Sequence, residues 1–193
     1  MKPVQSGSRR AVLAACLAVA AAGLGSAARA DDAAVQAVWA PKQLRFTYLG
    51  FTSKYSCDGL GDRVRRTLLT LGARADLKTT PTGCTEGFGR VSPFPGVAAT
   101  LNVLQPLGDK PPPAGTQTVS AHWKRVDLAP PGDPVRAAGD CELTEQIKES
   151  ILPLFTARNV EYSSTCLPNQ LQVGGTRLKA DVLIADPPAP KAP

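Results

Sequence analysis

The sequence predicts an α+β fold built from two tandem β-α-β-β repeats with pseudo-two-fold symmetry, in which both helices pack on one face of an antiparallel or mixed sheet. Three observations predict it: two cysteine-bracketed segments of similar length, an apolar pattern that recurs at a constant shift along the chain, and strand signals at matching places around both segments. The segments run from Cys57 to Cys84 and from Cys141 to Cys166. Whether the strands form one continuous sheet or two smaller ones stays open.

The N-terminal segment, which ends at Ala30, has the three parts of a secretory signal peptide. Lys2, Arg9 and Arg10 are basic, "AVLAACLAVAAAGLG" is apolar but too short to span a bilayer, and "ARA" ends at Ala30, where we expect cleavage. Two other routes stay open: "SRRAVL" partly resembles a twin-arginine export signal, and "LAAC" resembles a lipoprotein box that would acylate Cys16. The protein is therefore expected to be periplasmic or secreted.

The expected mature chain is nearly neutral. Of the 22 Lys and Arg residues four lie in residues 1–30, where no acid occurs, which leaves 18 bases against 16 acids and a net charge of +2. This balance and the predicted export argue against nucleic-acid binding. No second long apolar run occurs, so no transmembrane segment is expected after signal removal. The predicted organisation is a signal peptide (1–30), a first repeat (31–105), a Pro/Gly-rich linker (106–117), a second repeat (118–186) and a Pro-rich tail (187–193).

Each cysteine-bracketed segment is expected to contain an amphipathic helix. One constant shift superposes five apolar pairs: Leu60 and Leu143, Val64 and Ile147, Leu68 and Ile151, Leu69 and Leu152, and Leu71 and Leu154. Ser56 and Asp140, which precede the first cysteine of each segment, are good N-cap residues. Pro153 is expected to kink the second helix or end it early. With Trp39 and Trp123, which are separated by nearly the same shift, this correspondence predicts an internal duplication.

The predicted strands occupy matching places in the two repeats. They are 45–53 before the first helix, 75–80 and 97–105 after it, 118–128 before the second helix, and 159–164 and 176–185 after that one.

The mature chain holds four cysteines, an even number that predicts two disulfides in an exported protein. Of the three possible pairings, the repeat favours Cys57 with Cys84 and Cys141 with Cys166. No CxxC motif and no pair with zinc-ligand spacing occurs, so neither thiol chemistry, nor a metal, nor any cofactor is expected.

Few residues are candidates for catalysis. His122 is the only histidine, lies in a predicted strand beside Trp123 and has no GxSxG motif, which favours surface or interface packing. Residues 83–96 contain glycines and prolines but no phosphate-binding motif, which favours a long turn. Acids with helical spacing could support glycoside cleavage, although such acids usually form a solvated helix face; they are Asp58, Asp62, Glu142, Glu145 and Glu149.

The charge differs between the halves. Residues 33–109 carry nine bases and five acids, and residues 119–186 carry seven bases and nine acids. One interpretation is that the opposite charges help the halves dock or keep the protein soluble. The other is an anion or partner contact at Arg63, Arg65 and Arg66 of the first helix.

These observations favour an exported, disulfide-stabilised bacterial envelope protein that is a binding or interaction module without enzymatic activity. Its partner would be an envelope protein or a small ligand. The alternative is a periplasmic hydrolase that acts through carboxylates on a cell-wall substrate. The sequence decides neither the ligand nor the oligomeric state.

Overall fold

A computed structural model describes residues 34–51, 55–84, 92–109, 111–112, 114–128, 140–167 and 175–187. The strands are β1 (Val35–Thr47), β2 (Lys78–Thr82), β3 (Gly96–Pro106), β4 (Thr118–Asp127), β5 (Ala157–Ser164) and β6 (Thr176–Ala185). The helices are α1 (Cys57–Thr70) and α2 (Asp140–Gln146), and α2 continues through a π-helical turn, η2 (Ile147–Ile151), into a 3-10 turn, η3 (Leu152–Leu154). The predicted signal peptide, including Cys16, and residues 188–193 of the tail lie outside the described residues.

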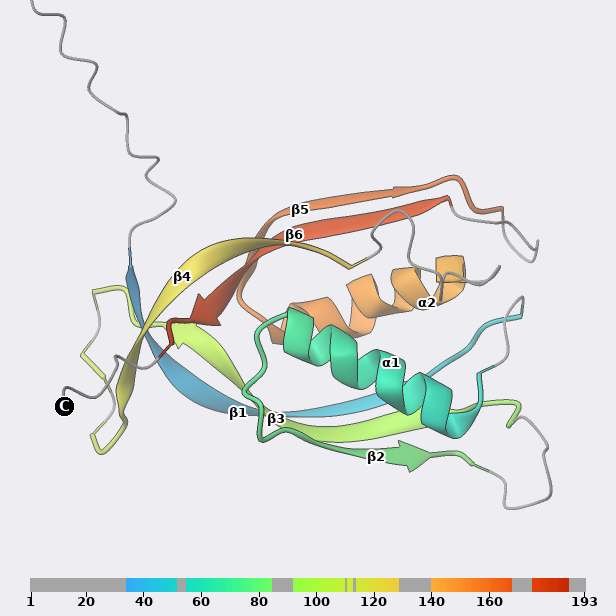
Figure 1. Cartoon of the computed structure of the whole chain (residues 1–193), viewed down its shortest axis with the longest axis horizontal. Coiled ribbons are helices and arrows are strands. Elements are labelled where there is room, and N and C mark those ends of the chain that lie inside the picture. The colour runs from blue at the N-terminus through green and yellow to red at the C-terminus, as the bar shows by residue number, and fades with distance from the viewer. Residues whose placement is uncertain are drawn as a thin grey trace, which may run out of the picture.

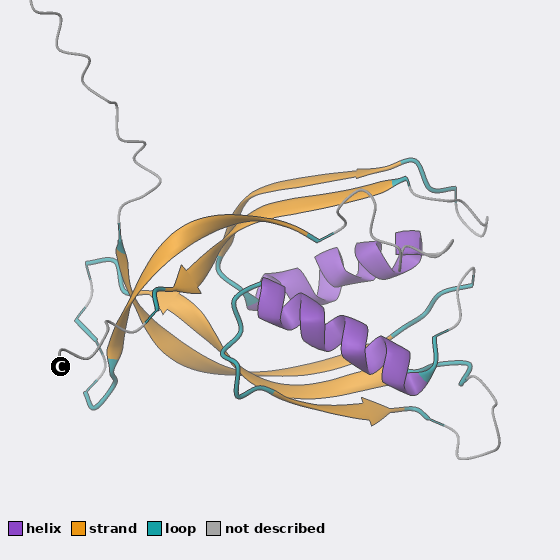
Figure 2. Ribbon diagram, in the orientation of Figure 1, coloured by secondary structure: helices purple, strands orange, loops and turns teal. Residues whose placement is uncertain are grey.

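The strands form one continuous sheet in the order β2-β3-β1-β4-β6-β5, and all neighbours are antiparallel. The strands of the first half meet those of the second half where β1 pairs with β4, from Val35 opposite Ala121 to Val38 opposite Thr118. The sheet curls around α1 and α2, which both lie on its inner face (Figures 1 and 2). The predicted α+β class is confirmed, and the open question is resolved in favour of one antiparallel sheet.

Strand β1 differs from the prediction of a strand over 45–53, because it begins at Val35 and ends at Thr47. Pro41 obscures this strand in the sequence, since proline cannot donate to a sheet ladder and is rare in central strands. The structure accommodates it because β4 pairs with β1 only as far as Val38, so that among the described strands β3 alone pairs with β1 at Pro41.

Helix α1 begins as its sequence predicts. The side chain of Ser56 accepts a hydrogen bond from the backbone N–H of Gly59 at 3.1 Å, which satisfies one of the free donors of the first turn. Leu60, Val64 and Leu68 are completely buried, so the predicted apolar stripe faces the sheet. Leu69, which the apolar pattern places in the same stripe, is 38% exposed instead.

The end of α1 requires a glycine. Gly72 has a φ of +92°, its N–H donates to the carbonyl of Leu69 at 3.1 Å, and the N–H of Ala73 donates to the carbonyl of Leu68 at 3.0 Å. These bonds form a Schellman motif, which closes a helix with a left-handed residue. A Cβ atom on Gly72 would also lie 2.7 Å from the carbonyl oxygen of Leu183 in β6. The turn after α1 therefore packs directly against the second half of the sheet.

The second helix changes geometry before it ends. Proline has no N–H to donate to the carbonyl of residue i−4, which for Pro153 is Glu149. The chain passes from α-helix to the π-helical turn η2 and then to η3, which ends at Leu154. The predicted distortion at Pro153 is confirmed. Helix α2 begins at Asp140, whose side chain lies outside the described residues.

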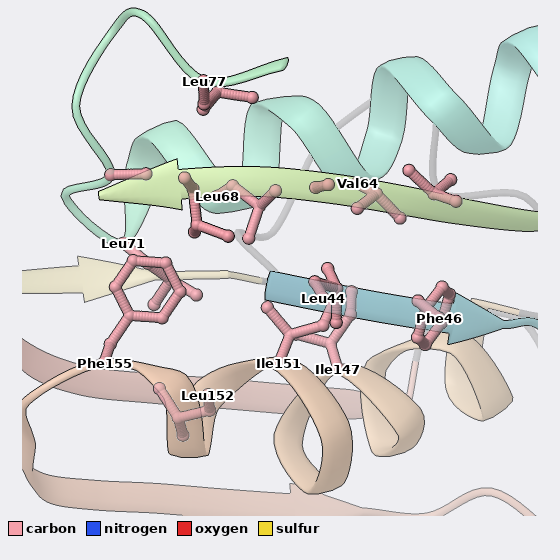
Figure 3. Packing of buried hydrophobic residues seen from close by; sticks show 14 of the residues in the cluster. Leu44, Phe46, Val64, Leu68, Leu71, Leu77, Ile147, Ile151, Leu152 and Phe155 are labelled. Atoms are coloured by element: carbon pink, nitrogen blue, oxygen red, sulfur yellow. The ribbon is translucent and has the colours of Figure 1, made fainter. Parts of the chain in front are cut away.

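The core lies between the two helices and the inner face of the sheet. Leu44 and Phe46 of β1 contact a layer formed by α1 and by the turns that follow α2 (Figure 3). Among its completely or nearly completely buried members are Leu60, Val64, Leu68, Val97, Leu101, Leu143, Ile151, Leu178 and Val182. A smaller cluster on the outer face covers the junction between the halves and is centred on Ala37, Leu104, Ala121 and Leu183.

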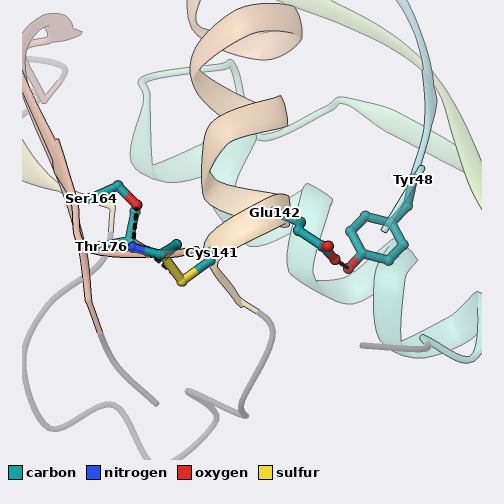
Figure 4. Close-up of a disulfide and its surroundings, with 6 residues drawn as sticks. Tyr48, Cys141, Glu142, Ser164 and Thr176 are labelled. Carbon is teal, nitrogen blue, oxygen red and sulfur yellow. Dashed lines mark hydrogen bonds between the residues drawn. A yellow bond between two sulfur atoms is a disulfide. The ribbon is translucent and has the colours of Figure 1, made fainter. Parts of the chain in front are cut away.

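Two disulfides join Cys57 to Cys84 and Cys141 to Cys166, the pairs that the sequence favours, with Cα atoms 6.1 Å apart in each. Each connects the start of a helix to the second residue beyond the strand that follows it. Beside the second disulfide (Figure 4), the hydroxyl group of buried Thr176 lies 3.3 Å from both sulfur atoms.

Candidate binding surface

The segment that follows β1 is held in place by two side chains of the second helix. Oε2 of Glu142 accepts hydrogen bonds from the hydroxyl group of Tyr48 at 3.1 Å (Figure 4) and from the backbone N–H of Phe51 at 2.9 Å. Oε1 of Gln146 accepts a third from the backbone N–H of Leu49 at 3.0 Å. We call these contacts of Tyr48, Leu49 and Phe51 with Glu142 and Gln146 the clamp.

The clamp is tightly packed around Gly50. A Cβ atom on Gly50 would lie 1.8 Å from the hydroxyl oxygen of Tyr48 and 2.6 Å from Oε2 of Glu142. Tyr48 is only 2% exposed, and its ring packs edge to face on that of Tyr55, with 4.9 Å between ring centroids. Only glycine fits at position 50 in this arrangement.

The clamp presents large apolar side chains to solvent. Leu49 is 61% exposed and Phe51 is 81% exposed. The backbone N–H of Tyr48 donates to the carbonyl of Pro95 at 2.9 Å, one residue pair beyond the β1–β3 ladder, and the neighbouring Phe94 is 60% exposed. We call Leu49, Phe51 and Phe94 the apolar tip. The segment that follows β1 lies at the opposite end of this strand from the β1–β4 pairing (Figure 1).

The acids predicted as candidates have two different environments. Asp58 and Asp62 of α1 are exposed, as are Glu145 of α2 and Glu149 of η2. Glu142 is half-buried and belongs to the clamp, so it does not lie on a solvated helix face. The sequence pattern could not distinguish it, because its spacing from Glu145 and Glu149 is that of an exposed acidic face.

His122 lies beside an aspartate and a serine. Its Nδ1 is 2.6 Å from Oδ1 of Asp186, and the hydroxyl group of Ser120 donates to Oδ2 of the same carboxylate at 2.5 Å. The hydrogen bond from Ser120 and, to a smaller extent, the contact with His122 hold the pKa of Asp186 below its usual value. Within the described part of the chain no side chain bonds to Nε2 of His122, where a triad requires its nucleophile.

The three arginines predicted as an anion or partner contact lie on α1 in different surroundings. Arg65 is half-buried and donates from Nη1 to the carbonyl of Leu77 at 3.1 Å, which anchors the chain that leads into β2. Arg66 is exposed and Arg63 is half-buried. Their role as an anion contact stays a prediction.

Two Trp–Arg contacts went unnoticed in the sequence. The guanidinium of Arg74 lies 5.6 Å from the ring centroid of Trp39, and that of Arg158 lies 4.1 Å from the ring centroid of Trp123. Both arginines follow their tryptophans at the same distance in the sequence, so the shift that relates the two tryptophans could have revealed them. Arg74 also makes a bidentate pair with Asp76 at 2.9 and 2.8 Å, which lowers the pKa of that carboxyl group.

In the part of the chain that the structure describes, no group of three or more His, Cys, Asp or Glu residues is arranged to hold a metal ion. None of the described helices is long and apolar enough to cross a membrane. No protein-family model matches the chain, and neither a curated protein nor a solved structure shows significant similarity to it.

Proposed function

We propose that this chain is an exported bacterial envelope protein that binds a partner protein through the apolar tip, without enzymatic activity. The observation that carries the proposal is the combination of a fixed backbone with exposed apolar side chains. The N–H groups of Leu49 and Phe51 are both bonded to α2, while their side chains remain 61% and 81% exposed. An apolar surface held in one conformation loses little entropy on binding, which favours recognition.

The chemistry of the tip favours a partner with an apolar surface. Aromatic side chains are enriched at the centres of protein interfaces, where they bury a large area. Phe51 and Phe94 supply two such rings, and Leu49 adds a third exposed apolar side chain. The proposed occupant is therefore an apolar segment of another envelope protein.

Export is supported by the signal-peptide pattern of residues 1–30 and by the two disulfides, which persist in oxidising compartments. Mass spectrometry of the protein from a periplasmic fraction tests it, and an N-terminus at Asp31 is the expected result. A cytoplasmic protein that retains Met1 would contradict export. A chain acylated at Cys16 would instead support the lipoprotein route.

We also infer that the two halves arose by duplication. The strand orders β2-β3-β1 and β5-β6-β4 match when each strand of the first half is paired with the strand three places later in the chain. The Trp39–Arg74 contact recurs as Trp123–Arg158, and the same sequence shift relates both residues of the first pair to those of the second. The two disulfides also close loops of similar length, with separations of 27 and 25 residues. Agreement of topology, contacts and disulfides supports a common origin.

Site-specific photo-crosslinking in living bacteria tests the proposed binding surface. A photoreactive amino acid at position 51 of the full chain is expected to capture one envelope protein. The same amino acid at position 160 is the control, because Val160 is a 46% exposed apolar residue of β5. A photoreactive amino acid at position 94 should capture less of this envelope protein when Leu49→Ser and Phe51→Ser are combined. The thermal stability of this double variant should equal that of the unchanged protein.

Equal capture from positions 51 and 160, or capture from position 94 that the double variant leaves unchanged, would contradict the proposal. The alternative, a periplasmic hydrolase acting through carboxylates, has its own test. Release of fragments from purified cell-wall material, lost on Glu145→Gln or Glu149→Gln, would support it.

A further inference from the structure

A shallow pocket of about 330 Å³ lies on the sheet over β1, β2 and β3, apart from the apolar tip. Its lining includes Gln43, Arg45, Lys78, Thr80, Ala98 and Thr100. Leu44 and Phe46 of β1 face the core, so the alternation of the strand turns Gln43 and Arg45 to the outer face, away from the helices. Figure 2 shows these three strands side by side with α1 on their other face.

The cross-strand register explains the shape of the pocket. Thr100 of the central strand β3 lies between Gln43 of β1 and Lys78 of β2. In the next row on this face, Ala98 lies between Arg45 and Thr80. Small residues therefore form the floor, and long side chains stand on both sides of it.

The corresponding row of the second half has the opposite arrangement. There the residue of the central strand β6 is Lys179, which lies between Asp127 of β4 and Glu161 of β5. Nζ of Lys179 is 3.5 Å from Oδ2 of Asp127, and Arg125 makes an ion pair of 2.6 Å with Glu161. A long cation thus occupies the middle of this row, with an acid on the neighbouring strand on each side of it.

The first half lacks this internal balance. Among the described residues no acid lies within ion-pair distance of Arg45 or Lys78, and no acid lines the pocket. The lining instead offers a guanidinium, an ammonium, two hydroxyl groups and a side-chain amide, all of which can donate hydrogen bonds. A bound anion would therefore meet two cations and several hydrogen-bond donors in this lining, with no lining acid to repel it.

From this pattern we infer that the pocket binds a phosphate group, carried by a small molecule or by a lipid headgroup. Arginine and lysine are the usual phosphate-binding side chains, and the planar guanidinium can bind two phosphate oxygens at once. The volume is at the small end of ligand pockets and fits a phosphate with a small attached group. This site is independent of the apolar tip and adds a second ligand to the proposed function.

Two measurements on the mature, oxidised protein test the inference. One is a titration with glycerol 3-phosphate at constant ionic strength. The other is cosedimentation with phosphatidylglycerol vesicles and, separately, with phosphatidylcholine vesicles. Arg45→Gln and Lys78→Gln are each expected to weaken binding by about tenfold, as loss of a charge-assisted hydrogen bond does. The matched control is Arg177→Gln, which removes an exposed arginine of β6 outside the pocket.

Thr100→Lys is the decisive variant, because it introduces into β3 a lysine at the position that matches Lys179 of β6. It adds positive charge but fills the pocket, so binding should be lost if the pocket is the site. Binding that stays unchanged or tightens in this variant would overturn the inference, as would equal loss in Arg177→Gln or no binding of either probe by the unchanged protein. Binding of glycerol 3-phosphate alone identifies a soluble ligand, and binding of phosphatidylglycerol vesicles alone identifies a lipid headgroup. Unfolding temperatures equal to that of the unchanged protein establish that each variant is folded.

Discussion

The hydroxyl group of Tyr48 donates to Oε2 of Glu142 at 3.1 Å, although 94 positions separate the two residues. Tyr48 directly follows β1, the first strand of the first half, and Glu142 lies in the first turn of the second helix. The same carboxylate oxygen also accepts from the N–H of Phe51. This one side chain therefore joins the two halves of the protein at a point remote from the β1–β4 pairing.

Replacement of Glu142 should destabilise the fold. Glu142→Ala removes the acceptor of two hydrogen bonds, one of them from a buried tyrosine, and is expected to lower the free energy of unfolding by about 1–3 kcal/mol. Glu142→Gln keeps an oxygen acceptor and should cost less. Urea unfolding followed by tryptophan fluorescence measures both. Glu145→Ala is the control, because Glu145 is exposed on the same helix, and equal stability of the two alanine variants would contradict the importance of the clamp.

Gly50→Ala is expected to disrupt the clamp by steric overlap. The new Cβ atom would lie 1.8 Å from the hydroxyl oxygen of Tyr48, so either the tyrosine or the segment must move. Overpacking of this kind costs about 1–3 kcal/mol. Gly61→Ala is the matched control, since nothing lies within 4 Å of its Cβ position in α1, and alanine there should stabilise the helix by up to about 1 kcal/mol. Thermal unfolding distinguishes the opposite signs, and a Gly50→Ala protein as stable as the unchanged one would show that the segment is not held closely.

The disulfides should contribute a large part of the stability. Loops closed over 27 and 25 residues restrict the unfolded chain by about 3.5 kcal/mol each on a loop-entropy estimate. Replacing Cys141 and Cys166 together by serine should therefore lower the unfolding temperature strongly. Peptide mapping without reduction is expected to yield one peptide pair that contains Cys57 with Cys84 and another that contains Cys141 with Cys166. A linked peptide pair that contains Cys57 and Cys141 would contradict the pairing.

The sequence predicted the elements that depend on local patterns. The spacing of Leu60, Val64 and Leu68 marked α1, and the alternation over 176–185 marked β6 with its observed bounds. The first residues of β1 were not predicted as a strand because of Pro41. Proline fits in a strand only where one edge of that strand is unpaired, and here this depends on where the pairing with β4 ends.

The candidate sites could not be predicted in this way, because they depend on contacts between distant residues. Glu142 has the same local pattern as the exposed acids Glu145 and Glu149, and only the packing of the β1 end on α2 distinguishes it. The pocket over β1, β2 and β3 depends on the register that sets Thr100 between Gln43 and Lys78. Sequence periodicity identifies the face of a strand on which a residue lies but not the residues beside it in the sheet.

Two aspartates should make the stability depend on pH at the acid end. The amide of Asn159 and then the guanidinium of Arg125 hold the pKa of Asp181 below its usual value, and Ser120 and His122 do so for Asp186. Because these pKa values are lower in the folded protein than in the unfolded chain, the contribution to stability is complete above the unfolded value of about 3.9. It is lost as the pH falls through the lower folded value.

Asp181→Asn should therefore lower the unfolding temperature at pH 7 and flatten its dependence on pH below about 4, because the variant has no proton to bind at this position in acid. Differential scanning calorimetry from neutral pH into the acid range measures both effects. Asp62→Asn, an exposed position on α1, serves as the control and should keep the acid dependence of the unchanged protein. If Asp181→Asn and Asp62→Asn give the same profile, the network around Asp181 does not contribute to the acid sensitivity of the fold.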